Sequence, residues 1–226
     1  MTTLIAEDVL LMLLDDSGAF VSSDNRKPAL AGAVLAELAL TGAVEIETEK
    51  GLWKRTKVVV EDPTMVTDPV LVEALGDIDV KKRTAQDLVN RLGKELPDQL
   101  CARLVERGVL RREDSKMLGL IPRTRWPLAD ARYKSALRAS LHRALIEGED
   151  PDERTATVIA VLVAAEVLPK VVDRGSMSKK ELKKRADTIA EGGWATEAVR
   201  KAIQAAQAAV MAGITAATAG AAAAGS

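Results

Sequence analysis

The stretch Leu104–Leu128, LVERGVLRREDSKMLGLIPRTRWPL, indicates the fold and the function of this chain better than any other. A helix-like segment ends at Gly108, and a charged turn then leads to the apolar run Met117–Ile121, which Pro122 closes. This order of segments predicts a β-hairpin with an apolar tip. We expect the tip and the residues around it to form a contact surface, whose members are Arg111, Arg112, Lys116, Met117, Leu118, Leu120, Ile121, Arg123, Arg125 and Trp126.

Cations and one tryptophan around an apolar tip suit two kinds of anionic partner. One is a membrane surface, where headgroups attract Lys and Arg while apolar side chains enter the acyl region. The other is a nucleic acid that meets the wing of a winged-helix unit, because the order helix–helix–hairpin occurs twice, at residues 3–60 and 84–126. The helix predicted over Ala29–Leu40 contains no basic residue, which argues against the nucleic acid.

The charge of the chain is uneven, although the formal net charge is only −1. Residues 107–143 contain ten Lys and Arg residues against three acidic ones, a local charge of +7. Residues 61–79 contain six acidic residues and no basic one. A basic segment in a nearly neutral protein indicates a local anionic partner rather than general coating of nucleic acid.

The composition predicts a mainly α protein, a single helical domain with short β-hairpins. Aromatic residues make up 2% of the chain and hydrophobic residues 47%, so the core must consist of aliphatic side chains, which favours helix packing. We expect this domain over residues 1–200, and the end of a C-terminal helix with an Ala-rich, partly disordered tail over residues 201–226. The single cysteine, together with the lack of a signal peptide or a spanning apolar run, leads us to expect a cytoplasmic protein, peripherally associated with membrane.

Apolar periodicity and turn residues predict the other elements. The first helix contains Ile5–Leu14, with Thr2 or Thr3 as its cap, and Ser178 and Glu181 form a capping-box pattern near the end of the chain. A first hairpin is expected from Ala43–Thr48 and Lys54–Val60. The further helices are expected over Ala29–Leu40, Pro69–Leu75, Ala85–Leu92, Pro97–Arg107, Asp130–Leu145, Glu153–Leu168, Ser178–Glu191 and Trp194–Thr215.

The sequence shows no recognisable catalytic constellation. His142 is the single histidine, and we expect it at the surface or half-buried. Cys101 lies among Leu100, Leu104 and Val105 at core spacing, which predicts a buried, inert thiol. Neither a glycine-rich phosphate loop nor a metal-ligand spacing is present. We therefore expect a non-enzymatic protein with no catalytic residue, no metal and no cofactor.

Four passages of the chain resemble the Golgi phosphoprotein 3 family. They are Val9–Gly18 (VLLMLLDDSG), Leu30–Gly42 (LAGAVLAELALTG), Leu104–Leu110 (LVERGVL) and Leu118–Leu128 (LGLIPRTRWPL), and the run Asp150–Leu168 also fits. The family consists of peripheral membrane proteins whose eukaryotic members bind phosphatidylinositol 4-phosphate. The resemblance implies a mostly helical single domain with a headgroup pocket, and a protruding apolar hairpin that takes part in membrane insertion and self-association.

The pocket residues of the family are only partly present in this chain. The tryptophan of the family falls at Ser22 or Ser23, and its arginines fall at Ala31, Lys94 and Pro97. The resemblance therefore does not carry specific recognition of the 4-phosphate over to this protein. Cations close to these positions are candidates for binding a phosphoinositide-like headgroup, namely Arg26, Lys27, Arg91 and Lys94.

Two functions remain open from the sequence. The protein binds an anionic phospholipid membrane surface through its basic face and hairpin, or it is a scaffold whose hairpin forms homo-oligomers or binds protein partners. The resemblance implies protein partners as well, because eukaryotic members bind the cytoplasmic tails of glycosyltransferases and a myosin. Winged-helix DNA binding is the least favoured alternative, and we expect no nucleic acid as partner.

Overall fold

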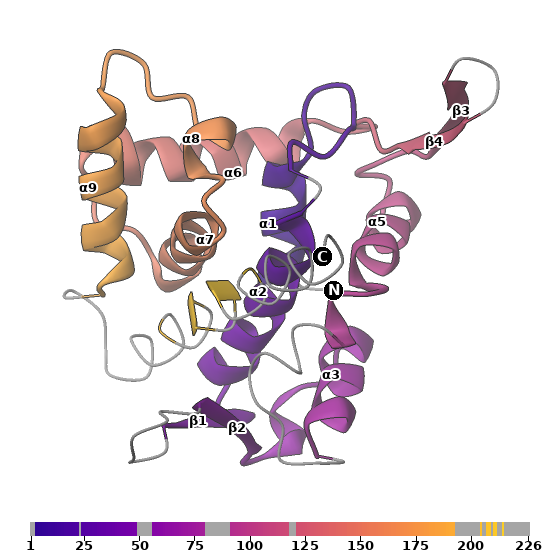
Figure 1. Cartoon of the computed structure of the whole chain (residues 1–226), viewed down its shortest axis with the longest axis vertical. Helices are drawn as coiled ribbons and strands as arrows, with labels where there is room; N and C mark the ends of the chain where they lie inside the picture. The colour runs from indigo at the N-terminus through magenta and orange to yellow at the C-terminus, as the bar shows by residue number, and fades with distance from the viewer. Residues whose placement is uncertain are drawn as a thin grey trace, which may run out of the picture.

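The computed structural model describes residues 3–22, 24–48, 56–79, 91–117 and 121–192, and positions 204, 207, 208, 210, 211 and 214. Among these residues the protein is mainly helical, as the sequence predicted (Figure 1). The helices are α1 (Ile5–Leu13), α2 (Arg26–Leu40), α3 (Pro69–Asp79), α5 (Leu96–Glu106), α6 (Arg132–His142), α7 (Glu153–Ala164), α8 (Leu168–Val171) and α9 (Lys179–Ala190). The strands are β1 (Val44–Thr48), β2 (Thr56–Val60), β3 (Glu113–Met117) and β4 (Ile121–Arg125), with a 3-10 turn at Pro63–Met65 and a π-helical turn at Arg143–Glu147.

Helix α1 forms the centre of the fold. Every residue of α1 is buried, and the helix packs against α2, α5, α6 and α7. In Figure 1 it lies between α6–α9 on one side and α3 and α5 on the other. Its apolar residues, among them Leu10, Leu11 and Leu13, are completely shielded from solvent. Every face of α1 therefore meets a neighbouring element, and its two acidic residues, Glu7 and Asp8, are buried together with the apolar ones.

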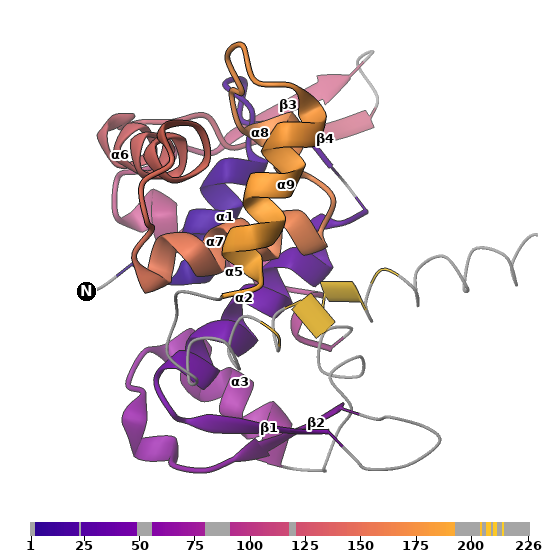
Figure 2. The same cartoon turned by 90° about the vertical axis from the view of Figure 1, so that its left-hand side faces the viewer.

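The two hairpins lie at opposite ends of the molecule (Figures 1 and 2). Strands β1 and β2 pair antiparallel from Val44 opposite Val60 to Thr48 opposite Thr56. Strands β3 and β4 pair antiparallel from Glu113 opposite Arg125 to Met117 opposite Ile121. The β3–β4 hairpin projects from the helical body, whereas β1–β2 lies beside α2 and α3. The predicted positions of both hairpins are confirmed.

The base of the β3–β4 hairpin is anchored to the loop between α1 and α2. The backbone N–H of Trp126 donates a hydrogen bond to the carbonyl oxygen of Gly18 at 2.8 Å. Gly18 has φ +75°, and a Cβ atom there would overlap the backbone of Trp126 and Pro127. Only glycine adopts this conformation without strain and also permits this close approach. The contact therefore fixes where the hairpin leaves the body.

Several predicted boundaries differ from the structure for local reasons. Helix α2 begins at Arg26 rather than Ala29, so that Arg26 and Lys27 belong to its first turn. The helix predicted over residues 153–168 is interrupted at Glu166, whose φ of +55° reverses the chain between α7 and α8. The cap of α1 is Leu4 rather than Thr3, because the side chain of Glu7 accepts the Leu4 N–H at 2.8 Å.

Other predictions are confirmed or lie outside the described residues. The capping box of α9 is present, with Glu181 N 3.2 Å from Ser178 Oγ and Ser178 N 2.9 Å from Glu181 Oε2. Most of the helix predicted over residues 85–92 is outside the described residues, and only positions 91 and 92 are seen, as helix. The described positions between 204 and 214 are helical. None of the described helices is both long and apolar enough to cross a membrane.

Replacing Gly18 by alanine should destabilise the protein far more than the same change at Gly42. Both glycines have φ near +75° (+75° and +78°), but a Cβ atom at Gly42 would meet nothing within 4 Å. We expect Gly42→Ala to lower the free energy of unfolding by about 1 kcal/mol through backbone strain alone, and Gly18→Ala by at least about 3 kcal/mol. Urea denaturation of the two variants measures the difference. Equal losses would contradict a close contact at the hairpin base.

Candidate functional site

The β3–β4 hairpin contains two charged zones that behave differently. Near its base, Arg111 pairs with Glu113 at 2.9 Å and Arg112 pairs with Asp114 at 3.0 Å. These pairs neutralise the part of the hairpin closest to the body. Thr124 strengthens this arrangement by donating its hydroxyl hydrogen to Asp114 Oδ1 at 2.8 Å. Although the sequence predicts both arginines as contact residues, their charges are already compensated within the hairpin.

The outer part of the hairpin retains uncompensated cations. Lys116 and Arg123 are exposed, and their side chains form no ion pair or hydrogen bond with any residue that the structure describes. Lys116 lies opposite Pro122 and Arg123 opposite Ser115, next to the last described pair of the hairpin, Met117 opposite Ile121. Arg125 lies at the base of the hairpin, opposite Glu113, and its charge interacts with that of Asp15. Leu118 and Leu120, which the sequence predicts as contact residues, lie outside the described part of the chain.

Trp126 does not belong to the exposed surface, and its prediction as a contact residue is wrong. Its side chain is only 7% exposed and packs in the main hydrophobic core. The guanidinium of Arg112 lies over the indole ring, 5.7 Å from its centroid, which covers the ring further. Strand β4 ends at Arg125, and the chain then turns into the body, where Trp126 is bonded to Gly18. The sequence pattern did not show this turn.

The basic segment 107–143 is not a uniformly positive face. Lys134 is buried, its ammonium donates to the Leu14 carbonyl oxygen at 2.5 Å, and burial lowers the pKa of Lys134 to about 8. Most of the other cations have acidic partners. The pairs outside the hairpin are Arg107 with Glu7, Arg132 with Asp130, Arg138 with Asp16 and Arg143 with Glu149. The uncompensated positive charge of this segment is therefore concentrated on the outer part of the hairpin.

The predicted headgroup residues do not form one site. Arg26 lies over the ring of Phe20, 4.8 Å from its centroid, and Lys27 is an exposed residue of the first turn of α2. Arg91 and Lys94 line a cavity of about 250 Å³, to which Arg26 and Lys27 do not contribute. In this cavity Arg91 pairs with Asp77 at 2.6 Å. Three carboxylates share that cavity, those of Glu73, Asp77 and Glu95. An anion is disfavoured there, because acidic side chains outnumber basic ones.

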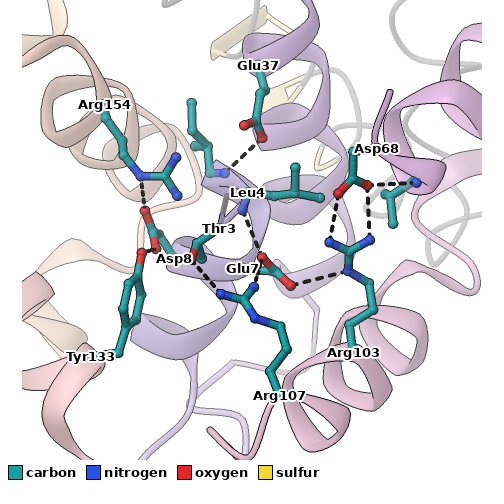
Figure 3. A network of polar contacts seen from close by, with 12 residues as sticks. Thr3, Leu4, Glu7, Asp8, Glu37, Asp68, Arg103, Arg107, Tyr133 and Arg154 are labelled. Atoms are coloured by element: carbon teal, nitrogen blue, oxygen red, sulfur yellow. Dashed lines mark hydrogen bonds and ion pairs between the residues drawn. The ribbon is translucent and has the colours of Figure 1, made fainter. Parts of the chain in front are cut away.

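A buried polar network, which the sequence reasoning did not identify, surrounds the start of α1 (Figure 3). Glu7 is completely buried and pairs with Arg103 of α5 at 3.3 Å and with Arg107, the C-cap of α5, at 2.9 Å. Asp8, 1% exposed, accepts hydrogen bonds from Tyr133 of α6 and from Arg154 of α7, each at 2.6 Å. The two carboxylates thus connect α1 to three other helices.

Two further carboxylates extend this network. Asp68 holds Arg103 through two hydrogen bonds of 3.0 and 2.8 Å. Glu37 of α2 accepts the backbone N–H of Ile5 at 2.9 Å. Burial raises the pKa of Glu37 to about 7, and burial also raises the pKa of Asp8 despite the opposing charge of Arg154. Acidic residues inside apolar helices are a sequence signal for such a network, but sequence spacing does not name their partners.

A comparison with protein families matches the Golgi phosphoprotein 3 (GPP34) family over residues 5–206. The chain belongs to the GPP34 family. The match includes α1, the β3–β4 hairpin and every helix through α9, so the resemblance noted in the sequence is confirmed. No curated protein matches the chain.

Within this GPP34 fold, the positions of the family's pocket residues are only partly open to a ligand. Ala31 is completely buried in α2 and Pro97 is buried at the start of α5. Ser22 is half-buried, and Ser23 lies outside the described residues. Lys94 lines the acidic cavity described above. Ala31 and Pro97 have no cationic side chain that could donate hydrogen bonds to a phosphate. The hairpin is therefore the better candidate site.

The single histidine and the single cysteine have the environments that the sequence predicted. Cys101 is completely buried, and burial, together with the nearby carboxylate of Asp98, raises its pKa to about 12. Its thiol is therefore not ionised near neutral pH. The His142 side chain is 47% exposed, with Nδ1 3.1 Å from Glu147 Oε1.

Replacing Glu37 by glutamine should change how stability depends on pH. The raised pKa means that the folded protein binds a proton at Glu37 between about pH 4.5 and 7, where the unfolded chain has lost it. Stability from this group is therefore complete below pH 4.5 and is lost as pH rises through 7. We expect Glu37→Gln to be more stable than the wild type at pH 8, by about 1–3 kcal/mol, and equally stable at pH 4.5.

Urea denaturation between pH 4.5 and 8 measures this effect. Glu106→Gln, at an exposed position of α5, is the control for the loss of one carboxylate. If the stability difference between Glu37→Gln and the wild type stays constant over this pH range, Glu37 is ionised throughout and the assignment is incorrect.

Proposed function

We propose that this GPP34 protein is a non-enzymatic peripheral membrane protein that binds anionic phospholipid through the outer part of the β3–β4 hairpin. The observation that carries the proposal is the position of Lys116 and Arg123. These two cations have no acidic partner among the described residues and lie on an element that projects from the body. The family membership is consistent with this function.

The apolar sequence between the two strands of the hairpin supplies the second part of the argument. Residues 117–121 are Met, Leu, Gly, Leu and Ile, a sequence suited to the acyl region of a bilayer. Burial of each large apolar side chain in that region contributes about 1–2 kcal/mol. Each Lys or Arg next to an anionic surface contributes about 1 kcal/mol. Together these contributions give a reversible membrane affinity, with no spanning segment required.

The anchored base supports this role mechanically. Hydrogen bonds of 3.0 Å from Arg111 N to Pro127 O and of 2.8 Å from Trp126 N to Gly18 O hold the hairpin on the body. A projecting element that is fixed at its base presents its tip without a large loss of conformational entropy on binding. The ion pairs near the base leave the positive charge at the outer part, where the lipid surface would lie.

Removing the two outer cations together with Arg125 should weaken binding to anionic vesicles. We expect the triple variant K116Q/R123Q/R125Q to bind phosphatidylglycerol-rich liposomes about 100-fold more weakly than the wild type. Binding of the wild-type protein should also decrease as the salt concentration rises. The wild-type protein should bind only weakly to liposomes of pure phosphatidylcholine. Liposome co-sedimentation at two salt concentrations measures both effects.

The matched control removes three exposed charges elsewhere. Lys179, Lys180 and Lys184 of α9 are exposed, and the triple variant K179Q/K180Q/K184Q should bind liposomes almost as well as the wild type. Equal losses in the two triple variants would show attraction by net charge alone and would contradict a hairpin site. If Leu118→Asp with Leu120→Asp disrupts oligomers in sedimentation velocity and leaves lipid binding unchanged, the hairpin serves self-association instead.

A further inference from the structure

A second cavity, unrelated to the predicted headgroup residues, lies between α1, α6 and α8. Its volume is about 620 Å³, within the range of small-molecule sites in proteins. The floor is apolar, with Met12 of α1 and Leu141 of α6, which are 3% and 1% exposed, and with Val171 of α8. The cavity is therefore large enough for more than a single inorganic ion, and part of its lining suits a hydrocarbon group.

Basic side chains from two helices surround this apolar floor. Arg138 and His142 are four residues apart on α6 and therefore lie on the same side of that helix. Lys170 of α8 also lines the cavity, and it forms no ion pair or side-chain hydrogen bond with the described residues. The π-helical turn Arg143–Glu147 continues α6 directly after His142 and packs on α9. Such turns are frequent next to binding sites.

Three acidic groups lie in the cavity or contact its basic residues. Asp173 lines it, and its Oδ1 accepts the backbone N–H of Gly175 at 3.0 Å. Asp16 is bonded to Arg138 at 3.2 Å, and Glu147 to His142 at 3.1 Å. Lys170 has no ion pair among the described residues, while Arg138 and His142 retain further N–H groups for a ligand. Because the basic groups in the lining outnumber its one carboxylate, that of Asp173, the cavity favours an anionic group over a cationic one.

The cavity and the β3–β4 hairpin lie at the same end of the molecule. Both Figure 1 and Figure 2 show α6, α8 and the hairpin at the upper end, opposite to α3 and the β1–β2 hairpin. The acidic segment 61–79 belongs to that lower end. A membrane that contacts the hairpin would therefore approach the end where the cavity also lies.

We propose that the cavity between α1, α6 and α8 binds the phosphate of one anionic glycerophospholipid. Lys170, Arg138 and His142 surround the phosphate, and the first part of an acyl chain lies against Met12 and Leu141. This inference rests on the proposed membrane role in one respect: that role identifies a lipid as the source of the phosphate. A soluble phosphate ester would share the same cationic groups but would leave the apolar floor without a partner.

His142 makes the proposal directly testable, because it is the single histidine of the chain and lines the cavity. Its imidazole signals in a ¹H–¹³C NMR spectrum should shift saturably when dihexanoyl phosphatidic acid is added at fixed pH, below the micelle concentration. Dihexanoyl phosphatidylcholine, whose zwitterionic headgroup has no net negative charge, should cause a much smaller shift. Lys170→Gln should weaken binding of the phosphatidic acid about fivefold.

Lys94→Gln is the matched control, since it removes one exposed lysine that lines the acidic cavity, and it should leave the affinity unchanged. The hairpin variant K116Q/R123Q/R125Q should also retain the His142 shift, so that failure of the hairpin site and failure of this cavity are distinguished. Glycerol 3-phosphate that binds as tightly as the phosphatidic acid would overturn the lipid as ligand. The absence of a saturable shift, or equal affinities for Lys170→Gln and the wild type, would overturn the site itself.

Discussion

Two carboxylates inside the central helix constrain the rest of this fold. Glu7 and Asp8 are almost completely buried in α1, and an unpaired charge in that position would cost several kcal/mol. Arg103 of α5 and Arg107 at its C-cap compensate Glu7, and Arg154 of α7 compensates Asp8. Since these partners come from distant parts of the chain, α1 is paired correctly only when α5, α6 and α7 are all in place. The network therefore favours one arrangement of the helices over others of similar hydrophobic burial.

This central arrangement also determines where the functional ends of the molecule lie. The loop after α1 reaches the hairpin base, where Gly18 allows close contact with Trp126 and Pro127. The same end holds the cavity between α1, α6 and α8, while the acidic helix α3 lies at the other end. The separation of charge in the sequence thus becomes a separation in space.

Much of the fold could be predicted from local sequence signals. The helices and both hairpins follow from apolar periodicity and turn residues, and Cys101 was recognised as a core residue from its apolar neighbours. Boundaries were less accurate where tertiary contacts decide them, as at Leu4, where the side chain of Glu7 forms the cap. The hairpin was located correctly, but Trp126, one of its predicted contact residues, is buried. The ion pairs of Arg111 and Arg112 were also not predicted, because side-chain partners depend on packing that the sequence pattern does not contain.

The sequence by itself determined the helical class of the protein, its GPP34 family and the position of a basic, apolar hairpin. These properties follow from composition, periodicity and the order of short motifs, all of which are local along the chain. Only the tertiary structure decided which cations remain uncompensated. Arg138 meets Asp16 and Arg107 meets Glu7 across about a hundred residues or more, whereas Lys116 and Arg123 meet no acid among the described residues. Because electrostatic compensation depends on distance in space, it could not be read from the sequence.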